Sequence, residues 1–301
     1  MRYRGLPILC RILGLGALLA LCGGSPVRGD DSVTIGEPVR VPVTPASGYH
    51  LEWSPDSTTI AFARWIEGRG TAWTVPVSGG EATRLPIEMS GDFYLSWNPE
   101  GTHLAFDAYN PGTSGPNALW TIPVAGGGPT RISSRAANAP TWSPNGDRIA
   151  FVMHGTSLDI YSVTLDGGNL RRHTYDSSED FHPDWSPDGT HLAFTSERSG
   201  NRDIWIRPIG TGPAVQITTD PEHDDRCCWA PNGAWIAFVS DRSGSRNIWL
   251  KPVAGGDAVQ VTDRADSPSM PTWSPDGRHL MFGTMDDSGV WTVRIDFPTA
   301  V

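Results

Sequence analysis

The chain has 301 residues, with 33 acidic and 23 basic side chains and a formal net charge of −10. An acidic surface opposes non-specific binding to nucleic acid or to anionic lipid, so neither is expected as a partner. Length alone permits one or two domains, but the repeats described below fill residues 37–297 and leave no room for a second.

The N-terminal segment has the composition of a secretory signal peptide. Arg2, Arg4 and Arg11 form its basic region, and residues 12–21 form an apolar region that is short for a membrane span. We therefore predict a signal peptide over residues 1–29, no membrane span, and an exported protein located in the periplasm or outside the cell. Cleavage leaves 19 basic and 33 acidic residues, a formal charge of −14.

Two of the four cysteines, Cys10 and Cys22, lie in this leader. Acylation of Cys22 would tether the protein to a membrane, but Leu21 stands where a lipoprotein signal has a small residue, so we expect no lipid anchor. The rest of the chain keeps Cys227 and Cys228. A disulfide between neighbours is strained, which favours two thiols and leaves a vicinal disulfide as the alternative. A zinc site would need a second cysteine pair.

Residues 37–44 form an isolated strand-like segment ahead of six copies of a Trp-x-Pro-x-Gly-like motif. The motifs start at Trp53, Trp97, Trp142, Trp185, Trp229 and Trp273, at steps of 44, 45, 43, 44 and 44 residues. A period of this size, carried by aromatic and turn residues, is typical of a β-propeller with one repeat per blade. The sequence therefore predicts an all-β fold, a single six-bladed propeller over residues 30–301.

Each repeat contains four strand signals. In the fourth repeat they cover residues 182–185, 191–195, 204–209 and 214–218, separated by turn residues such as Ser-Pro-Asp-Gly. A second aromatic row marks the third strand of each repeat, at Trp73, Trp120, Tyr161, Trp205, Trp249 and Trp291. We predict four antiparallel strands per blade, with both aromatic rows in the core between blades rather than on a sugar-binding surface.

The last repeat ends near Asp296 and has no fourth strand after it. Residues 37–44 resemble the fourth strands of the other repeats. We therefore predict that this N-terminal segment completes the sixth blade and closes the ring, which protects the sheet edges.

Two repeats carry the same segment after the second strand. Residues 196–200 read Ser-Glu-Arg-Ser-Gly and residues 240–244 read Ser-Asp-Arg-Ser-Gly, followed by Asp-Ile-Trp at 203–205 and Asn-Ile-Trp at 247–249. With the Trp-Ser-Pro-Asp-Gly turn, these motifs resemble the repeats of the TolB-type propeller family. The resemblance implies a six-bladed propeller like that of TolB, which binds partner proteins in the periplasmic Tol–Pal system. The α/β domain that precedes the TolB propeller has no counterpart here, so we expect a stand-alone TolB-like propeller.

Recurrence in both repeats indicates that Arg198, Arg242, Asp203 and Asn247 brace the loop between the second and third strands. The loops before each first strand share one face of a propeller and are instead rich in unrepeated ionisable residues. The candidate binding residues there are His50, Glu52, Asp92, Glu179, Asp180, His182, Asp184, His223, Asp224 and Asp225. Solvation alone makes loops polar, and that accounts for much of this list.

The leading hypothesis is a monomeric, non-catalytic scaffold that binds a protein or peptide through the loop face or the channel. No catalytic residue or cofactor is assigned, and no Gly-x-Ser-x-Gly nucleophile motif occurs. The alternative is a metal-dependent polysaccharide lyase or hydrolase, with a divalent cation bound by His50, His182 and His223. Oligogalacturonate lyases, a propeller family with related repeats, use His ligands around a metal in this region, although no local ligand motif supports such a site here.

Overall fold

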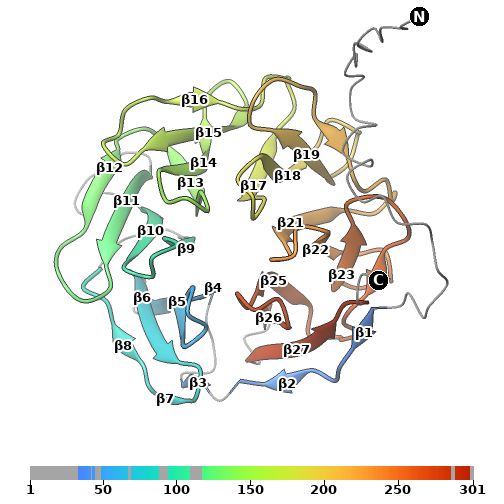
Figure 1. The fold of residues 1–301 in the computed structure, drawn as a ribbon, viewed down its shortest axis with the longest axis horizontal. Coiled ribbons are helices and arrows are strands. Elements are labelled where there is room, and N and C mark those ends of the chain that lie inside the picture. Colours follow the sequence, from blue (N-terminus) through green and yellow to red (C-terminus); the bar gives the residue numbers. More distant parts are fainter. Residues whose placement is uncertain are drawn as a thin grey trace, which may run out of the picture.

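The computed structural model describes residues 33–41, 43–44, 49–66, 69–87, 94–108, 117–285 and 289–298. Within these residues the chain forms 27 strands, of which 25 make up six blades in a ring (Figure 1) and two, β3 and β7, pair with each other. This arrangement confirms the six-bladed propeller that the repeat period predicts. The predicted signal peptide, with Cys10 and Cys22, lies outside the described residues.

Each of the first five blades is a four-stranded antiparallel meander. Blade 1 has β4 (Tyr49–Trp53), β5 (Thr59–Ile66), β6 (Arg69–Pro76) and β8 (Thr83–Arg84); blade 2 has β9 (Leu95–Trp97), β10 (His103–Ala108), β11 (Ala118–Pro123) and β12 (Thr130–Ser133). Blade 3 has β13 (Ala137–Trp142), β14 (Arg148–His154), β15 (Leu158–Thr164) and β16 (Arg171–Arg172). Blade 4 has β17 (Asp180–Trp185), β18 (His191–Ser196), β19 (Asp203–Pro208) and β20 (Val215–Gln216); blade 5 has β21 (Asp224–Trp229), β22 (Trp235–Ser240), β23 (Asn247–Pro252) and β24 (Val259–Gln260).

The sixth blade joins the two ends of the described chain. Its strands β25 (Pro268–Trp273), β26 (His279–Thr284) and β27 (Val290–Asp296) are completed by β1 (Thr34–Ile35) and β2 (Val39–Arg40), both antiparallel to β27 (Figure 1). The backbone N–H of Val41 extends the pairing by donating to the carbonyl of Val290 at 2.9 Å. Closure by an N-terminal segment is therefore confirmed.

The limits of the closing segment differ from the predicted 37–44. Pairing starts at Thr34 and ends at Val41, and β3 (Val43–Thr44) lies parallel to β7 (Gly80–Glu81) beside blade 1. Pro42 stands between the two pairings, and a proline has no N–H to donate to a ladder. The segment therefore changes partner between Val41 and Val43, from the last blade to a strand beside the first.

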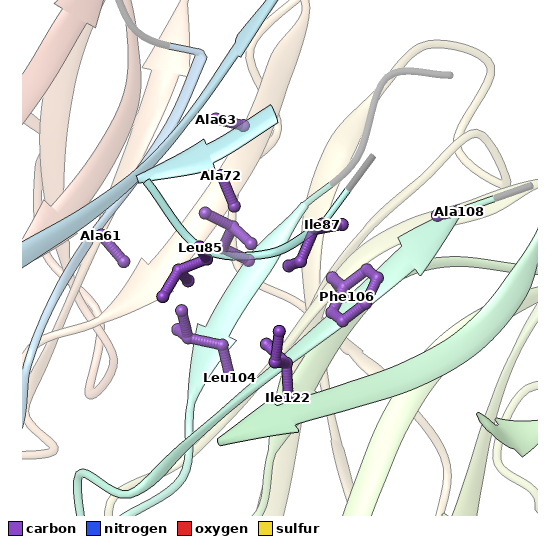
Figure 2. Close-up of a cluster of buried hydrophobic side chains, with 10 residues drawn as sticks. Ala61, Ala63, Ala72, Leu85, Ile87, Leu104, Phe106, Ala108 and Ile122 are labelled. Atoms are coloured by element: carbon purple, nitrogen blue, oxygen red, sulfur yellow. The ribbon is translucent and has the colours of Figure 1, made fainter. Parts of the chain in front are cut away.

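The core lies between consecutive blades. In each second strand a Leu or Ile, an Ala and a Phe follow one another, as in Leu104, Ala105 and Phe106, so the large and small side chains point to opposite faces. In Figure 2, Ala61 and Ala63 of blade 1 lie in one cluster with Leu104 and Phe106 of blade 2. The same small-against-large packing repeats around the ring, and only blade 6 differs, because Met281 replaces the alanine.

Deleting the closing segment tests how much it stabilises the ring. A chain that starts at residue 42 exposes the edge of β27 and uncovers apolar contacts of Ile35 and Val41. We expect it to lose about 2–3 kcal/mol of stability, a fall of roughly 4–12 °C in Tm, and to self-associate, whereas a chain that starts at residue 33 keeps the Tm of the protein without residues 1–29. Equal Tm values in thermal unfolding would contradict the assigned closure.

Candidate binding site in the central channel

The first strand of every blade faces the axis of the ring, and together these strands line a central cavity of about 390 Å³. The lining comes from β4, β13, β17, β21 and β25 and from Tyr94 and Leu95 in blade 2. This volume lies within the range of small-ligand sites. Each first strand ends at the tryptophan of its repeat. Equivalent positions in the six blades are therefore found by counting back from this tryptophan.

A bulge turns one residue of the first strand towards the channel mouth. The strand pairing shifts register in blades 1, 3, 4, 5 and 6, and in each case the residue three before the tryptophan has positive φ. These residues are His50 (55°), Ala139 (49°), His182 (47°), Arg226 (56°) and Met270 (53°). Tyr94 holds the same position in blade 2. We call these six residues the outer ring; none of the five that have positive φ is a glycine, which makes the conformation strained.

A second set of residues lies one position before each tryptophan, and all of them except the buried Ser96 line the cavity. We call it the inner ring: Glu52, Ser96, Thr141, Asp184, Cys228 and Thr272. Several of these residues tie blades together. Asp184 accepts a hydrogen bond from the backbone N–H of Trp229 at 2.7 Å, and Ser96 accepts one from that of Trp142 at 3.2 Å. Thr272 donates to Glu52 at 3.3 Å.

Tyr94 reaches across blade 3 to blade 4. Its hydroxyl lies 2.9 Å from His182 Nε2, and its ring contacts that of His50 at 3.7 Å between centroids, with the two planes tilted by 53°. The small side chain of Ala139 stands between the two blades and leaves room for this crossing. The buried Asp107 fixes the start of the strand by accepting a hydrogen bond from the Tyr94 N–H at 3.0 Å.

The buried Asp225 holds His182 in place through a hydrogen bond. Its carboxylate lies 2.9 Å from His182 Nδ1 and 3.1 Å from Nη1 of Arg202. Burial opposes ionisation of Asp225, but His182, Arg226 and Arg202 outweigh it and hold its pKa well below the usual range. The result is a connected row of polar groups, Asp225–His182–Tyr94, whose last two members line the mouth of the channel.

The channel environment shifts several other pKa values. Burial, followed by the charges of Arg226 and His182, holds the pKa of His50 well below its usual value, so the ring is neutral at pH 7. Burial and then repulsion from Asp184 raise the pKa of Glu52 to about 8, and burial raises that of Asp184 to about 6. The two inner-ring carboxyls, Glu52 and Asp184, therefore share a cavity in which no neighbouring cation offsets their burial and mutual repulsion.

The structure brings four of the predicted residues together in the channel: His50, Glu52, His182 and Asp184. Asp225 is buried behind His182, while Glu179 and His223 are exposed on loops, with His223 accepting from the Arg202 N–H at 3.2 Å. Asp92 lies outside the described residues. Four of the ten predicted residues therefore line the channel, and the binding role of the set stays a prediction.

Asp180 and Asp224 do not line the channel. Each is fully buried and forms a two-oxygen hydrogen bond with Nη2 of an arginine in its own blade, Arg198 and Arg242 respectively. Arg242 also lies over Phe238 and Trp249, as Arg198 lies over the equivalent rings. Burial raises the pKa of Asp224 although Arg242 opposes the rise.

The repeated loop residues act as braces. Asp203 accepts hydrogen bonds from Ser199 and Thr218, and Asn247 accepts one from Thr262 at 2.9 Å. With the arginine pairs described above, these contacts confirm the structural role that recurrence predicts. Recurrent polar residues therefore hold the loops, and function has to be sought in residues that differ from blade to blade.

The sequence reasoning missed Tyr94, Arg226, Met270 and Cys228. It collected only His and acidic residues, whereas the outer and inner rings are defined by position. Counting back three residues and one residue from each tryptophan finds all of them. Cys227 and Cys228 are free thiols, the first buried and the second half-buried. They are neighbours on β21, so their side chains leave the strand on opposite faces.

The alternative metal site is not assembled. Among the residues that the structure describes, no three His, Cys, Asp or Glu side chains come together to hold a metal ion. His50 and His182 both contact Tyr94, but His223 is exposed on its loop.

The described segments contain no helix long and apolar enough to span a bilayer.

The pH dependence of stability tests the environment of Glu52. Its ordinary pKa is 4.5 and its folded pKa is about 8, so the folded protein holds an extra proton between these values and loses stability as pH rises through them. Glu52→Gln cannot ionise. We compare the free energy of unfolding of the variant with that of the parent at pH 5 and at pH 8.5. Because the cavity is open to solvent, we expect this difference to shift in favour of the variant by only about 1–2 kcal/mol between the two pH values. Urea unfolding at both values measures this, and an unchanged difference would contradict it; exposed Glu222→Gln serves as the control.

Comparison with known proteins agrees with this architecture. The TolB beta propeller domain family matches residues 133–222 and 197–299, more than half of the chain. A TolB homolog of Chlorobium luteolum is 40% identical over 73 residues, which are 24% of this chain and 17% of that protein. The match thus spans less than a fifth of that relative's length.

Solved structures show the same fold. A TolB structure from Agrobacterium tumefaciens has a TM-score of 0.68 at 24% identity, over 85% of this chain and 92% of that one. An oligogalacturonate lyase in complex with manganese has a TM-score of 0.59 at 18% identity, over 83% and 77% of the two chains. At these identities the likeness concerns the fold alone. With the ring of blades and the family match over more than half of its length, the chain belongs to the TolB β-propeller domain family.

Proposed function

We propose that the protein is an exported, non-catalytic scaffold that binds a protein or peptide partner at the mouth of its central channel. One observation carries this proposal. The framework residues repeat from blade to blade, whereas the outer ring has a different residue in almost every blade and only histidine occurs twice. A ring-building role predicts similar residues at these six positions, so their variety favours recognition of a specific ligand.

Backbone strain supports the same conclusion. His50, His182 and Arg226 adopt positive φ although their side chains gain nothing from that conformation as isolated residues. Such strain costs on the order of 1–3 kcal/mol per residue and is found at functional sites. Here it directs ring nitrogens and a guanidinium into a cavity that is open to solvent at the mouth.

Capture of a partner tests the proposal. Ala139→Phe puts a bulky ring where Tyr94 crosses the mouth, and Ala254→Phe places the same ring on an exposed turn between third and fourth strands at the opposite end of blade 5. In pull-downs from periplasmic extract, we expect Ala139→Phe to recover at least about tenfold less partner than Ala254→Phe, a difference of about 1.4 kcal/mol. Equal recovery by two folded variants would reject the channel mouth as the binding surface.

Export is part of the proposal. It is supported by the signal-peptide composition of residues 1–29 and by membership of a family that includes Tol–Pal components among its named relatives. Fusing residues 1–29 to a reporter that is active only outside the cytoplasm should give activity, and a fusion that lacks the apolar residues 12–21 should give none.

A further inference from the structure

The outer ring contains an arginine with an unused binding edge. Nη1 of Arg226 donates to the Ser269 hydroxyl at 3.0 Å, while its Nε is buried and has no hydrogen-bond partner among the described residues. This guanidinium has no carboxylate within 4 Å among the described residues, although its charge acts on Asp225, and its side chain lines the cavity. Nε and Nη2 form the side edge of a guanidinium, which binds the two oxygens of a carboxylate in parallel.

The inner ring presents the opposite charge. Glu52 and Asp184 come from blades 1 and 4, on opposite sides of the six-membered ring, and both line the same cavity as Arg226. Their mutual repulsion helps to raise the pKa of Glu52 to about 8. No Lys or Arg is among the described residues that line the cavity, apart from Arg226 in the outer ring. A ligand cation between the two carboxyls would replace this repulsion with attraction.

The size of the cavity limits the ligand. Arg226 in blade 5, Asp184 in blade 4 and Glu52 in blade 1 all line one cavity of about 390 Å³, so a ligand small enough to enter it lies close to both kinds of charge. The α-carboxylate and side-chain cation of a lysine are separated by a flexible four-carbon stem. An internal peptide residue has no free main-chain carboxylate, so a single residue carries both charges when it is a C-terminal lysine or arginine.

Resting on the proposed function, we propose that the channel binds the C-terminal basic residue of a peptide. Arg226 receives the terminal carboxylate in the outer ring, and Glu52 with Asp184 receives the lysine or arginine side chain in the inner ring. His182 and Tyr94, held by Asp225, line the mouth beside the carboxylate site. The cavity of about 390 Å³ accommodates one such residue and leaves the rest of the peptide on the loop face.

Three small probes separate the two halves of the site. Nα-acetyl-lysine carries both charges, Nα-acetyl-norleucine carries only the carboxylate, and Nα-acetyl-lysine methylamide carries only the cation. In calorimetric titrations of the protein without residues 1–29, we expect the first probe to bind at least about tenfold more tightly than either of the others. Arg226→Gln should abolish the advantage over the methylamide, and Glu52→Gln should reduce the advantage over norleucine.

Proton release gives a second readout that a merely structural role would not produce. Binding of a cation beside Glu52 expels its proton at pH 7, so the heat of binding of Nα-acetyl-lysine should depend on the ionisation enthalpy of the buffer. Nα-acetyl-norleucine and the Glu52→Gln variant should show no such dependence. Arg278→Gln, an exposed arginine on the opposite end of the ring, serves as the matched control for Arg226→Gln.

Equal affinities for the three probes, failure of all three to bind, or binding of Nα-acetyl-lysine without proton release would each overturn the inference. The same variants distinguish failure of this inference from failure of the proposed function. If a partner is captured by the parent protein and by Arg226→Gln alike, but not by Ala139→Phe, the channel mouth binds a partner and the C-terminal basic residue is not what it recognises.

Discussion

Replacing Asp224 with alanine is expected to lower the free energy of unfolding by about 3–5 kcal/mol, because it leaves the Arg242 guanidinium without its buried partner. Asp224 is fully buried, and both of its oxygens accept from Nη2 of Arg242 at 2.6–2.7 Å. The pair joins the start of β21 to the loop after β22. Urea unfolding of Asp224→Ala, Arg242→Met and the double variant measures the coupling, which we expect to exceed about 1.5 kcal/mol.

Two controls define this result. Asp180→Ala breaks the equivalent pair with Arg198 in blade 4 and should cost about as much as Asp224→Ala. Asp296→Ala breaks the exposed pair with Arg294 and should leave the unfolding midpoint unchanged. Additive effects of Asp224→Ala and Arg242→Met would show that the two residues stabilise the blade independently, contrary to the structure.

Replacing Phe238 with alanine is expected to cost about 3–5 kcal/mol. Phe238 is fully buried and packs from blade 5 against Ala193, Ile204 and Ile206 of blade 4. Because the cavity opens at a contact between two blades, neither sheet can close it by moving alone. The measurement is the free energy of unfolding in urea, with Leu165→Ala, an apolar side chain that is 43% exposed, as the control expected to change stability by less than about 1 kcal/mol.

A loss below about 2 kcal/mol for Phe238→Ala would mean that the blades are held together mainly by other contacts. The same substitution at Phe194 tests the neighbouring interface, where the ring packs against Ala150 and Ile160. Similar losses at both positions are expected, since the alternation of large and small side chains repeats around the ring.

The fold could be predicted because its determinants repeat. Six tryptophan motifs, each with a turn and an alternating strand, specify the same four-stranded sheet six times, and a missing last strand points to a donor at the other end of the chain. The limits of that donor could not be predicted from similarity alone. The change of partner between Val41 and Val43 depends on which neighbouring strand is in reach, and this is a property of the closed ring.

The site could be predicted only in part. Its residues are those whose side chains face the channel, and the type of a side chain does not show which way it points. Asp180 and Asp184 are four residues apart on one strand, yet the first is buried beneath Arg198 and the second faces the channel. A bulge between Phe181 and Asp184 changes the alternation, and its constant distance from the tryptophan becomes visible only when the strands of the different blades are superposed. Arg226 was overlooked because the predicted set contained only histidines and acidic residues.

Hydrogen exchange of the complex with a captured partner tests the central claim most directly, namely that repeated residues build the ring while the non-repeating channel residues bind. We expect slower exchange on binding in peptides that contain His50, His182 and Arg226, and unchanged exchange in the turns that follow Trp53, Trp185 and Trp229 at the opposite end of the same blades. Slower exchange confined to those turns, or to the outer strands β16, β20 and β24, would contradict the account.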